Sequence, residues 1–306
     1  MQPKDILVVL DGTQQSMVML GVSTDLAGRF GARLDAVCPL SLLAGDPPVR
    51  EDSGIFGAGG TGGVLAPLVP PKGAAAPSPD SPPERAERIG IAFHEELQRN
   101  GLEGDFLSTV GRPGEAVAKR ARTADLVVLG QPEPEQAKAS AHRNMVEDVL
   151  MTSGRPVLMI PFAGEFTTIG RNVLIGWVEG PEAARAAHEV LVLATPGAKL
   201  TVLTVRRGAA PEDQVELPGA EIARHLARHG FDVEADETVA GASLPPSFTV
   251  RPAVSEADAL LNYATDRAAD LLAVGCYGHS RTREMVLGGV TRDLLSHMTL
   301  PVLMSR

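Results

Sequence analysis

The chain has few cysteines, few aromatic residues and a deficit of basic charge. Its 306 residues include two cysteines, Cys38 and Cys276, which cannot form the network of bridges that holds a small secreted domain. Aromatic residues make up 4% of the chain, so aliphatic side chains and alanine must fill the core. The net charge is −10, which argues against nucleic acid as a partner because phosphate contacts need a basic surface.

Long apolar runs are also absent. No run in the sequence approaches the roughly 18 residues of a membrane-spanning helix. The first residues, MQPKDILVVLDG, do not have the pattern of a signal peptide. With 44% hydrophobic and 22% charged residues, the composition is that of an ordinary globular protein. We therefore expect a soluble cytoplasmic protein with no membrane partner.

Short apolar runs alternate with amphipathic stretches along the first part of the chain. The runs predict strands, and the stretches between them predict helices. The strands are expected at 6–12, 33–39, 104–110, 125–130 and 155–161, and the helices at 16–30, 83–98, 113–123 and 140–152. Continuous apolar strands that alternate with helices indicate a parallel sheet covered on both faces.

The same order returns in the second part of the chain. Strands are expected at 172–178, 199–205, 233–239, 270–275 and 300–305, and helices at 181–194, 220–229, 255–269 and from about 288. Asp125 and Asp270 are 145 positions apart, and so are Pro156 and Pro301, and Asp148 and Asp293. The pattern predicts two domains, 1–162 and 172–306. Each is expected to hold a five-stranded parallel sheet with helices on both faces.

The first copy carries about 22 extra residues in its middle, within 44–83. This segment is rich in Gly, Pro, Ala and Ser and has no periodicity, so it predicts a flexible insertion. Gly57, Gly59 and Gly62 formally match G-x-G-x-x-G, but no strand precedes them and no helix follows directly, so a phosphate role is not expected. A second excursion, 242–254, interrupts the second copy.

Three spaced glycines, Gly275, Gly278 and Gly288, lie between a predicted strand and a predicted helix of the second copy. Their spacing, G-x2-G-x9-G, resembles the motif of the universal stress protein (UspA-like) family. The segments ILVVLDGTQQS and GWVEGPEAARA resemble the opening of the family's domain in each copy. The resemblance covers nearly the whole chain, as a tandem pair. It implies two flavodoxin-like (adenine nucleotide alpha hydrolase-like) domains packed as an intramolecular pseudo-dimer, with a homo-dimer of the chain as a further option.

The resemblance also implies a stress-response regulatory or binding protein that takes ATP, with Mg, in its second domain. The residues expected to bind the nucleotide are Gly275, Gly278, His279, Ser280, Gly288, Gly289, Val290 and Thr291. Glycines allow the backbone to approach a ligand closely, and free N–H groups at a helix N-terminus attract phosphate. The alternative is that these glycines only shape a turn and a close contact between helix and sheet.

Two departures from the family pattern weaken the expected site. Gly289 stands where the family has Ser or Thr, and Val178 where it has the aspartate that contacts adenosine. The first copy keeps Asp11 and Gly130 but has Glu133, Arg143 and Asn144 in place of the loop glycines. A carboxylate would repel phosphate and larger side chains would crowd the loop. We therefore expect a degenerate first site, in which Asp11 has the alternative role of capping the adjacent turn.

Other residues give only weak indications of a metal-binding or catalytic site. His225 and His229 are four positions apart on a predicted helix, but with no third ligand evident they are interpreted as a solvated face, and no metal site is expected. Cys276 and His279 could form a nucleophile pair, but no orienting group is identifiable. Trp177 is expected to be a core residue under the first helix of its copy. No catalytic residue is expected, because no residue near the loop is placed to act as the general base of ATP hydrolysis. The alternative function is a scaffold for a protein partner or an apolar ligand.

Overall fold

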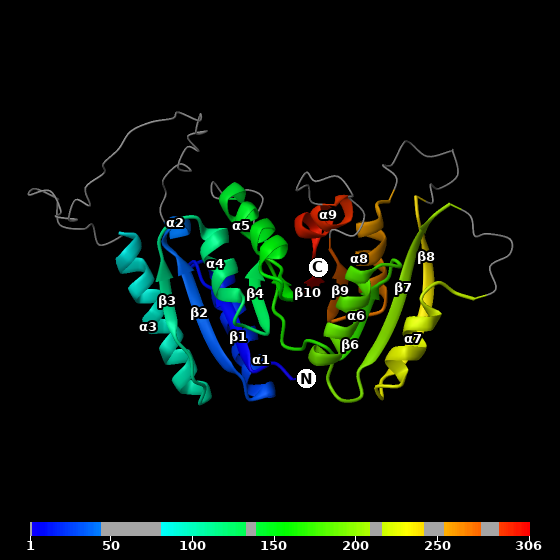
Figure 1. Cartoon of the computed structure of the whole chain (residues 1–306), viewed down its shortest axis with the longest axis horizontal. Helices are drawn as coiled ribbons and strands as arrows, with labels where there is room; N and C mark the ends of the chain where they lie inside the picture. The colour runs from blue at the N-terminus through cyan, green and yellow to red at the C-terminus, as the bar shows by residue number, and fades with distance from the viewer. Residues whose placement is uncertain (1, 44–80, 133–138, 209–215, 242–253, 277–287) are drawn as a thin grey trace, which may run out of the picture.

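The computed structural model describes residues 2–43, 81–132, 139–208, 216–241, 254–276 and 288–306. Its first half contains β1 (Asp5–Val9), α1 (Gln14–Phe30), β2 (Arg33–Pro39), α2 (Leu40–Leu43), α3 (Pro82–Asn100), β3 (Phe106–Thr109), α4 (Pro113–Ala121), β4 (Leu126–Gly130), α5 (Ala139–Thr152) and β5 (Val157–Ile160). Every strand and helix expected for this half is confirmed, and α2 is an addition (Figure 1). Most of the predicted insertion, 44–80, lies outside the described residues, and α3 already begins at Pro82.

The second half follows the same order. It contains β6 (Asn172–Gly176), α6 (Pro181–Leu193), β7 (Lys199–Arg207), α7 (Ala220–Ala227), β8 (Asp232–Ala240), α8 (Glu256–Asp266), β9 (Leu271–Gly275), α9 (Gly289–His297) and β10 (Val302–Ser305). Its expected strands and helices are likewise confirmed. A capping box begins α8: the backbone N–H of Asp258 donates to the Ser255 hydroxyl oxygen, and the backbone N–H of Ser255 donates to the Asp258 carboxylate. The excursion at 242–253 lies outside the described residues.

All ten strands form one sheet, in the order β3-β2-β1-β4-β5-β10-β9-β6-β7-β8. Neighbouring strands are parallel within each half, which confirms the expected α/β class. The halves do not keep separate sheets, however: β5 and β10 pair antiparallel, with Leu158 opposite Leu303. The last strand of each half therefore lies at the centre of the molecule.

Equivalent aspartates hold the start of the first strand in each half. Asp125 accepts hydrogen bonds from the backbone N–H groups of Lys4, at 2.7 Å, and Asp5, at 3.2 Å. Asp270, 145 positions later, accepts them from Gly170, Arg171 and Asn172 at 3.0–3.1 Å. The carboxylates that mark the repeat in the sequence thus satisfy backbone donors that have no strand partner.

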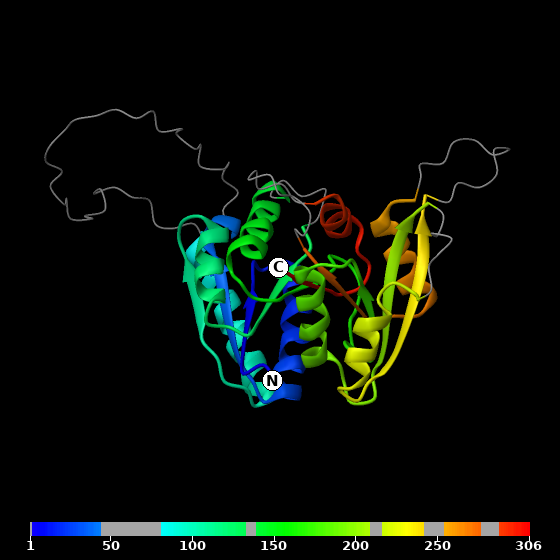
Figure 2. The same ribbon diagram turned by 45° about the vertical axis from the view of Figure 1, so that its right-hand side comes forward.

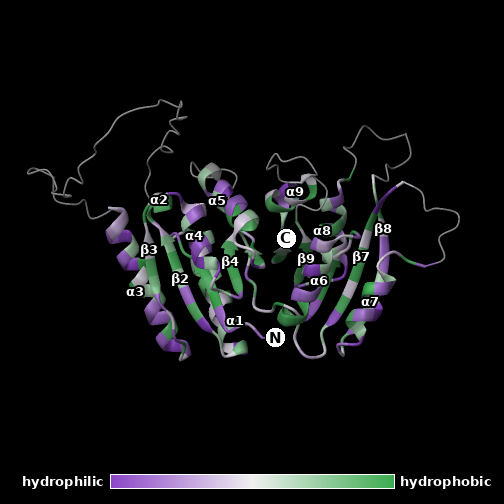
Figure 3. Ribbon diagram, viewed as in Figure 1, coloured by the Kyte–Doolittle hydropathy of each residue, from purple (hydrophilic) through white to green (hydrophobic). Residues whose placement is uncertain are grey.

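Two apolar layers, one on each face of the sheet, continue across both halves. Helices α1, α3, α6 and α7 cover one face, and their buried side chains meet strand residues such as Ile6 and Val8. Helices α4, α5, α8 and α9 cover the other face, where Leu7 and Val9 point. This alternation is the period of two that a strand imposes. In Figure 3 the hydrophobic colour runs along the strands, and the hydrophilic colour lies on the flanking helices.

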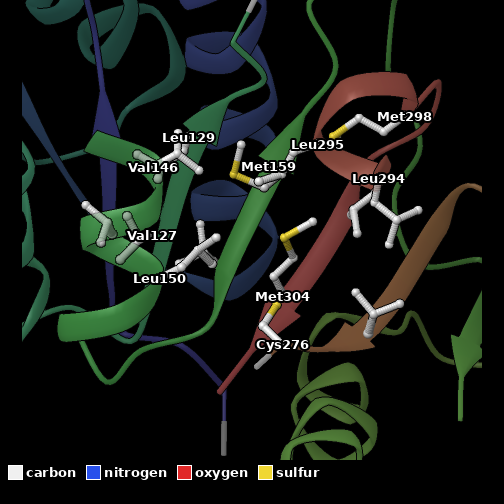
Figure 4. Close-up of a cluster of buried hydrophobic side chains, with 14 of the residues drawn as sticks. Val127, Leu129, Val146, Leu150, Met159, Cys276, Leu294, Leu295, Met298 and Met304 are labelled. Carbon is white, nitrogen blue, oxygen red and sulfur yellow. The ribbon is translucent and has the colours of Figure 1, made fainter. Parts of the chain in front are cut away.

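The centre of the sheet is packed from both halves. Figure 4 shows Met159 of β5 and Met304 of β10 close to side chains of α5, such as Leu150, and of α9, such as Leu294. On the opposite face the ends of α1 and α6 meet, and Figure 2 shows these helices side by side. There Arg29 donates to the backbone oxygens of Ile169 and Leu193, both at 2.7 Å. The two halves therefore share one core. Within the described ranges no helix has the length and apolar composition needed to cross a membrane.

A cavity of about 190 Å³ lies at this junction, lined by residues of both halves that include Asp125, Arg155 and Glu189. Glu189 accepts a hydrogen bond from the Ser305 hydroxyl. Burial raises the pKa of Glu189 to about 7, although the nearby charge of Arg185 acts against this shift. The carboxyl group is therefore partly protonated at neutral pH.

The raised pKa of Glu189 predicts a pH-dependent stability. The folded chain holds this proton more tightly than the unfolded chain, whose pKa is near 4.5. The stabilising contribution is therefore complete below about pH 4.5 and is lost as the pH rises through 7. We expect Glu189→Gln to be more stable than the native chain at pH 8, by on the order of 1 kcal/mol, and equal to it near pH 5. Urea unfolding at both pH values measures this.

Glu221→Gln is the matched control, because it removes the same charge from an exposed position on α7. It should shift stability equally at both pH values. A Glu189→Gln effect that does not depend on pH would show that the Glu189 carboxyl group does not titrate in this range.

Candidate functional site

The strand order predicts a crevice at the carboxyl ends of β6 and β9. These strands are neighbours in the sheet, yet β6 leads into α6 on one face and β9 leads toward α9 on the other. Such a change of direction is where open α/β sheets bind ligands. The predicted nucleotide residues of the second half belong to this region. Gly278, His279 and Ser280 lie outside the described residues, as do Arg281 and Arg283.

Gly275 ends β9 against the first turn of α6. A Cβ atom at this position would lie 2.5 Å from the backbone nitrogen of Ala183 and 2.9 Å from the Cβ of Glu182. Any side chain would therefore push α6 off the sheet. The structure gives Gly275 the close helix–sheet contact that the sequence left as an alternative to ligand binding.

The start of α9 is open. Gly288 is the N-cap residue, has extended backbone angles (φ −58°, ψ 147°) and offers no side-chain cap. Gly288 and Gly289 are exposed, and a Cβ atom on either would meet no other atom within 4 Å. Val290 is half-buried. The first N–H groups of a helix have no partner within the helix, so this end presents donors and a positive dipole to an anion.

Thr291 faces the core rather than the open end of α9. Thr291 is 5% exposed, and its hydroxyl group forms a hydrogen bond with the thiol of Cys276. This position does not suit the contact with phosphate expected from the sequence, since the hydroxyl already has a buried partner.

Cys276 is an inert thiol. It is fully buried, and its backbone N–H donates to the oxygen of Ser305 at 2.7 Å. Burial raises the pKa of its thiol to about 12, although the hydrogen bonds from Thr291 and at Ser305 act against this shift. A protonated, buried thiol is a poor nucleophile. The structure therefore contradicts the Cys276–His279 nucleophile pair considered from the sequence.

Trp177 and Val178 follow β6 and face opposite ways. Val178, at the position of the family aspartate, is 54% exposed. Trp177 is partly buried in the layer beneath α6 and α7, as expected for a core residue. Its ring lies beside Gly219, where a Cβ atom would be 3.3 Å from the Trp177 Cδ1. Trp177 therefore packs at the start of α7 as well as under α6.

The corresponding crevice of the first half is filled by the chain itself. Gln15, in the first turn of α1, donates through Nε2 to the backbone oxygens of Gln131, at 3.1 Å, and Ile160, at 3.0 Å. A Cβ atom on Gly130 would lie 2.7 Å from the Gln15 side chain. The remaining cavity, beside Asp11, has about 10 Å³, which is room for roughly one water molecule.

Asp11 has the capping role that the sequence left as its alternative. Its carboxylate accepts from the backbone N–H of Thr13, at 3.1 Å, and from the Thr13 hydroxyl, at 2.6 Å. Thr13 in turn caps α1 by accepting from the N–H of Ser16. Nearby, burial lowers the pKa of His142, while the charge of Asp11 raises it.

Of the two reasons expected for a degenerate first site, the crowding of a loop by Arg143 and Asn144 is wrong. Arg143 and Asn144 are exposed and lie inside α5, which begins at Ala139, so they do not crowd a loop. The equivalent helix α9 begins only at Gly289. The first half therefore has no helix N-terminus where the second half has one. Glu133 lies outside the described residues.

Only part of a histidine cluster was identified from the sequence. His225 and His229 lie near the end of α7, as expected, but His188 of α6 joins them, and its ring centroid is 5.0 Å from that of His225. Since 37 positions separate His188 from His225, only the packing of α6 on α7 reveals the contact.

The fold is that of an α/β protein with a doubly wound sheet, whose strand order changes direction between β6 and β9. Residues 170–306 match the model of the Universal stress protein family. The chain is 24% identical to a universal stress protein from Synechocystis over 307 residues, which cover 99% of this chain and all of the relative. The second half of the chain therefore matches the universal stress protein family, and the chain as a whole is similar to a universal stress protein.

Solved structures show the same fold over the whole chain. A universal stress protein from Archaeoglobus fulgidus superposes with a TM-score of 0.68 at 15% identity, covering 99% of this chain and 96% of that one. A putative universal stress protein from Pseudomonas aeruginosa gives a TM-score of 0.60 at 14% identity, covering 99% and 93%. The fold is thus shared at low sequence identity.

The buried thiols predict low reactivity. Burial also raises the pKa of the Cys38 thiol to about 12. We expect neither Cys38 nor Cys276 to react measurably with a disulfide reagent such as DTNB in the folded protein at pH 8, and both to react within minutes in 6 M guanidinium. Absorbance of the released thiolate measures the number of thiols. Rapid release of one equivalent from the folded chain would contradict the buried position of one cysteine.

Proposed function

We propose that this protein is a stress-response regulatory protein that binds the phosphate groups of a nucleotide weakly in the crevice of its second half. Its family supports the stress-response role. The observation that carries the proposal is the open N-terminus of α9, where Gly288 and Gly289 present N–H groups without a side-chain cap. The family resemblance suggests ATP with Mg as the ligand.

The contrast between the halves supports this location. In the first half Gln15 fills the crevice, and α5 begins five positions before the counterpart of Gly289. In the second half the counterpart of Gln15 is Glu182, whose carboxylate lies near Gly180 in the first turn of α6. The crevice of the second half is therefore the one proposed to accept the ligand.

The same residues limit affinity and base selectivity. Val178 offers an apolar, exposed side chain where the family has a carboxylate, so no acidic group at this position contacts the adenosine. Glu182 places a negative charge near the crevice, and this weakens phosphate binding. We therefore propose binding through phosphate, with similar affinity for ATP and GTP and much weaker binding of adenosine. The buried thiol of Cys276 agrees with a binding rather than a catalytic role.

A carboxylate at the start of α9 tests the proposal. Gly289→Glu places its side chain in open space, so the fold should be unchanged, and an acidic residue in a first helical turn is favourable for the helix. Its charge would repel phosphate, and we expect ATP affinity to fall by about 10- to 100-fold, or about 1.4–2.7 kcal/mol. Calorimetry with ATP and Mg measures this.

The matched control is Gly28→Glu on α1. Gly28 is also exposed, and its Cβ would also meet nothing within 4 Å. This variant should bind ATP like the native chain. Equal ATP affinity in all three proteins would refute phosphate binding at α9.

Restoring the family's acid tests base recognition. Val178→Asp is tolerated because the position is 54% exposed. We expect the native chain to bind ATP and GTP within about threefold of each other, and Val178→Asp to favour ATP by about tenfold, since the resemblance places at this position the aspartate that contacts adenosine. Titrations followed by Trp177 fluorescence measure both ligands. Tight adenosine binding by the native chain would contradict the proposal, because another group would then already read the base.

A scaffold for a protein partner or an apolar ligand is the second candidate. The filled crevice of the first half favours it, because Gln15 leaves no room there for a ligand. Absence of co-purified nucleotide in the denatured supernatant, together with no ATP binding by calorimetry, would support the scaffold.

A further inference from the structure

Three imidazole rings gather on the face of the sheet that α6 and α7 cover. His188 belongs to α6, His225 to α7, and His229 follows α7. The Nε2 atoms of His188 and His225 are 3.1 Å apart. The ring of His229 lies edge-on to that of His225, with centroids 5.1 Å apart. His188 and His229 are exposed and His225 is half-buried, so solvent reaches the group.

The hydrogen bonds of His188 define which of its nitrogens is free. Its Nδ1 lies 2.7 Å from the backbone oxygen of Ala184, and since a carbonyl oxygen can only accept, Nδ1 carries the proton. The Nε2 atom of neutral His188 therefore has a lone pair that points at His225. Partial desolvation lowers the pKa of His225, and the charges of His188, His229 and Arg228 lower it further. The lowered pKa favours the neutral form of His225, which is the form that binds a metal ion.

The distance between the two Nε2 atoms suits a shared metal ion. An imidazole nitrogen binds Zn²⁺ at about 2.0–2.1 Å, so two adjacent ligands of one ion lie roughly 2.9–3.4 Å apart. The 3.1 Å separation lies within this range without movement of either helix. The hydrogen bond from His188 Nδ1 to the backbone oxygen of Ala184 fixes the orientation of the ring, as hydrogen bonds to the second nitrogen of metal-binding imidazoles do. For His225 to bind through Nε2, its proton moves to Nδ1.

We propose that His188 and His225 form a two-ligand site for a divalent late transition-metal ion, bound most tightly as Cu²⁺, with water completing its coordination. Cu²⁺ stands highest in the affinity order of these ions for nitrogen ligands. Within the described ranges no three or more His, Cys, Asp or Glu side chains are arranged to hold a metal ion, so the protein supplies two ligands. The affinity is accordingly on the order of micromolar, and the nearby charge of Arg228 lowers it.

Trp177, the only tryptophan, reports binding at this site. It packs beside Gly219, the N-cap residue of α7, and His225 is six positions further, about 9 Å along the helix. A Cu²⁺ ion at this distance quenches indole fluorescence. We expect saturable quenching with one Cu²⁺ per chain at pH 7.5, and loss of binding near pH 5 as the imidazoles take up protons.

His188→Ala and His225→Ala should each weaken Cu²⁺ binding by at least tenfold, and both should stay folded because the rings are accessible to solvent. His297→Ala is the matched control. His297 is exposed on α9, and its Nδ1 makes the same kind of bond, 3.0 Å from the backbone oxygen of Asp293. The contacts between imidazole rings within the described residues join His188, His225 and His229 and do not involve His297. The control variant should bind Cu²⁺ like the native chain.

Electron paramagnetic resonance of the Cu²⁺ complex gives a second measure. The native chain should show coupling to two imidazole nitrogens, and each of the two single variants coupling to one or none. Unchanged Cu²⁺ affinity in both His188→Ala and His225→Ala, or a loss in His297→Ala as large as in either, would overturn the proposal.

Discussion

The antiparallel pairing of β5 with β10 is the contact on which the arrangement of the whole molecule depends. It places Leu158 opposite Leu303 and turns two five-stranded sets into one sheet. Because the sheet is continuous, both apolar layers are continuous too. Side chains of each half also bind the other half. Gln131 donates to the backbone oxygen of Leu295 in α9 at 3.0 Å, and Arg306 donates to the backbone oxygen of Met151 in α5 at 2.6 Å.

The two halves share a topology but have different crevices. A symmetric homodimer must build the same surface twice, whereas two halves of one chain can change separately. Here Gln15 occupies one crevice, while Gly288 and Gly289 leave the start of α9 open in the other. Gln131 connects them, since its backbone oxygen accepts from Gln15 and its side chain reaches α9. The closed half therefore supports the helix of the open half.

The sequence predicts the elements well because each buried strand is a short apolar run between glycine, proline and polar residues. The spacing of 145 also has a physical basis, since Asp125 and Asp270 hold equivalent strand starts. The structure of the site was less predictable. The sequence already predicted a helix over 140–152, close to the observed start at Ala139, so the error lay in aligning Arg143 with a loop glycine of the second half rather than in a helix boundary.

Contacts between distant segments leave no signal in one sequence. Nothing in the composition of β5 or β10 indicates that they pair with each other rather than end separate sheets. From the sequence, Gln15 is an ordinary residue of a first helical turn. Only the structure shows that it lies beside the ends of β4 and β5. His188 likewise became significant only when α6 packed against α7. In each case the tertiary arrangement, and not local propensity, determines the role of the residue.

The central position of β5 also has a consequence for synthesis on the ribosome. The partner of Val157–Ile160 is Val302–Ser305, the last strand of the chain. A nascent chain that has completed its first half therefore carries an unpaired strand edge of Val, Leu, Met and Ile, all fully buried in the finished protein. Unpaired apolar edges recruit other strands. Until β10 is made, the first half must be protected from joining a second nascent copy through this edge.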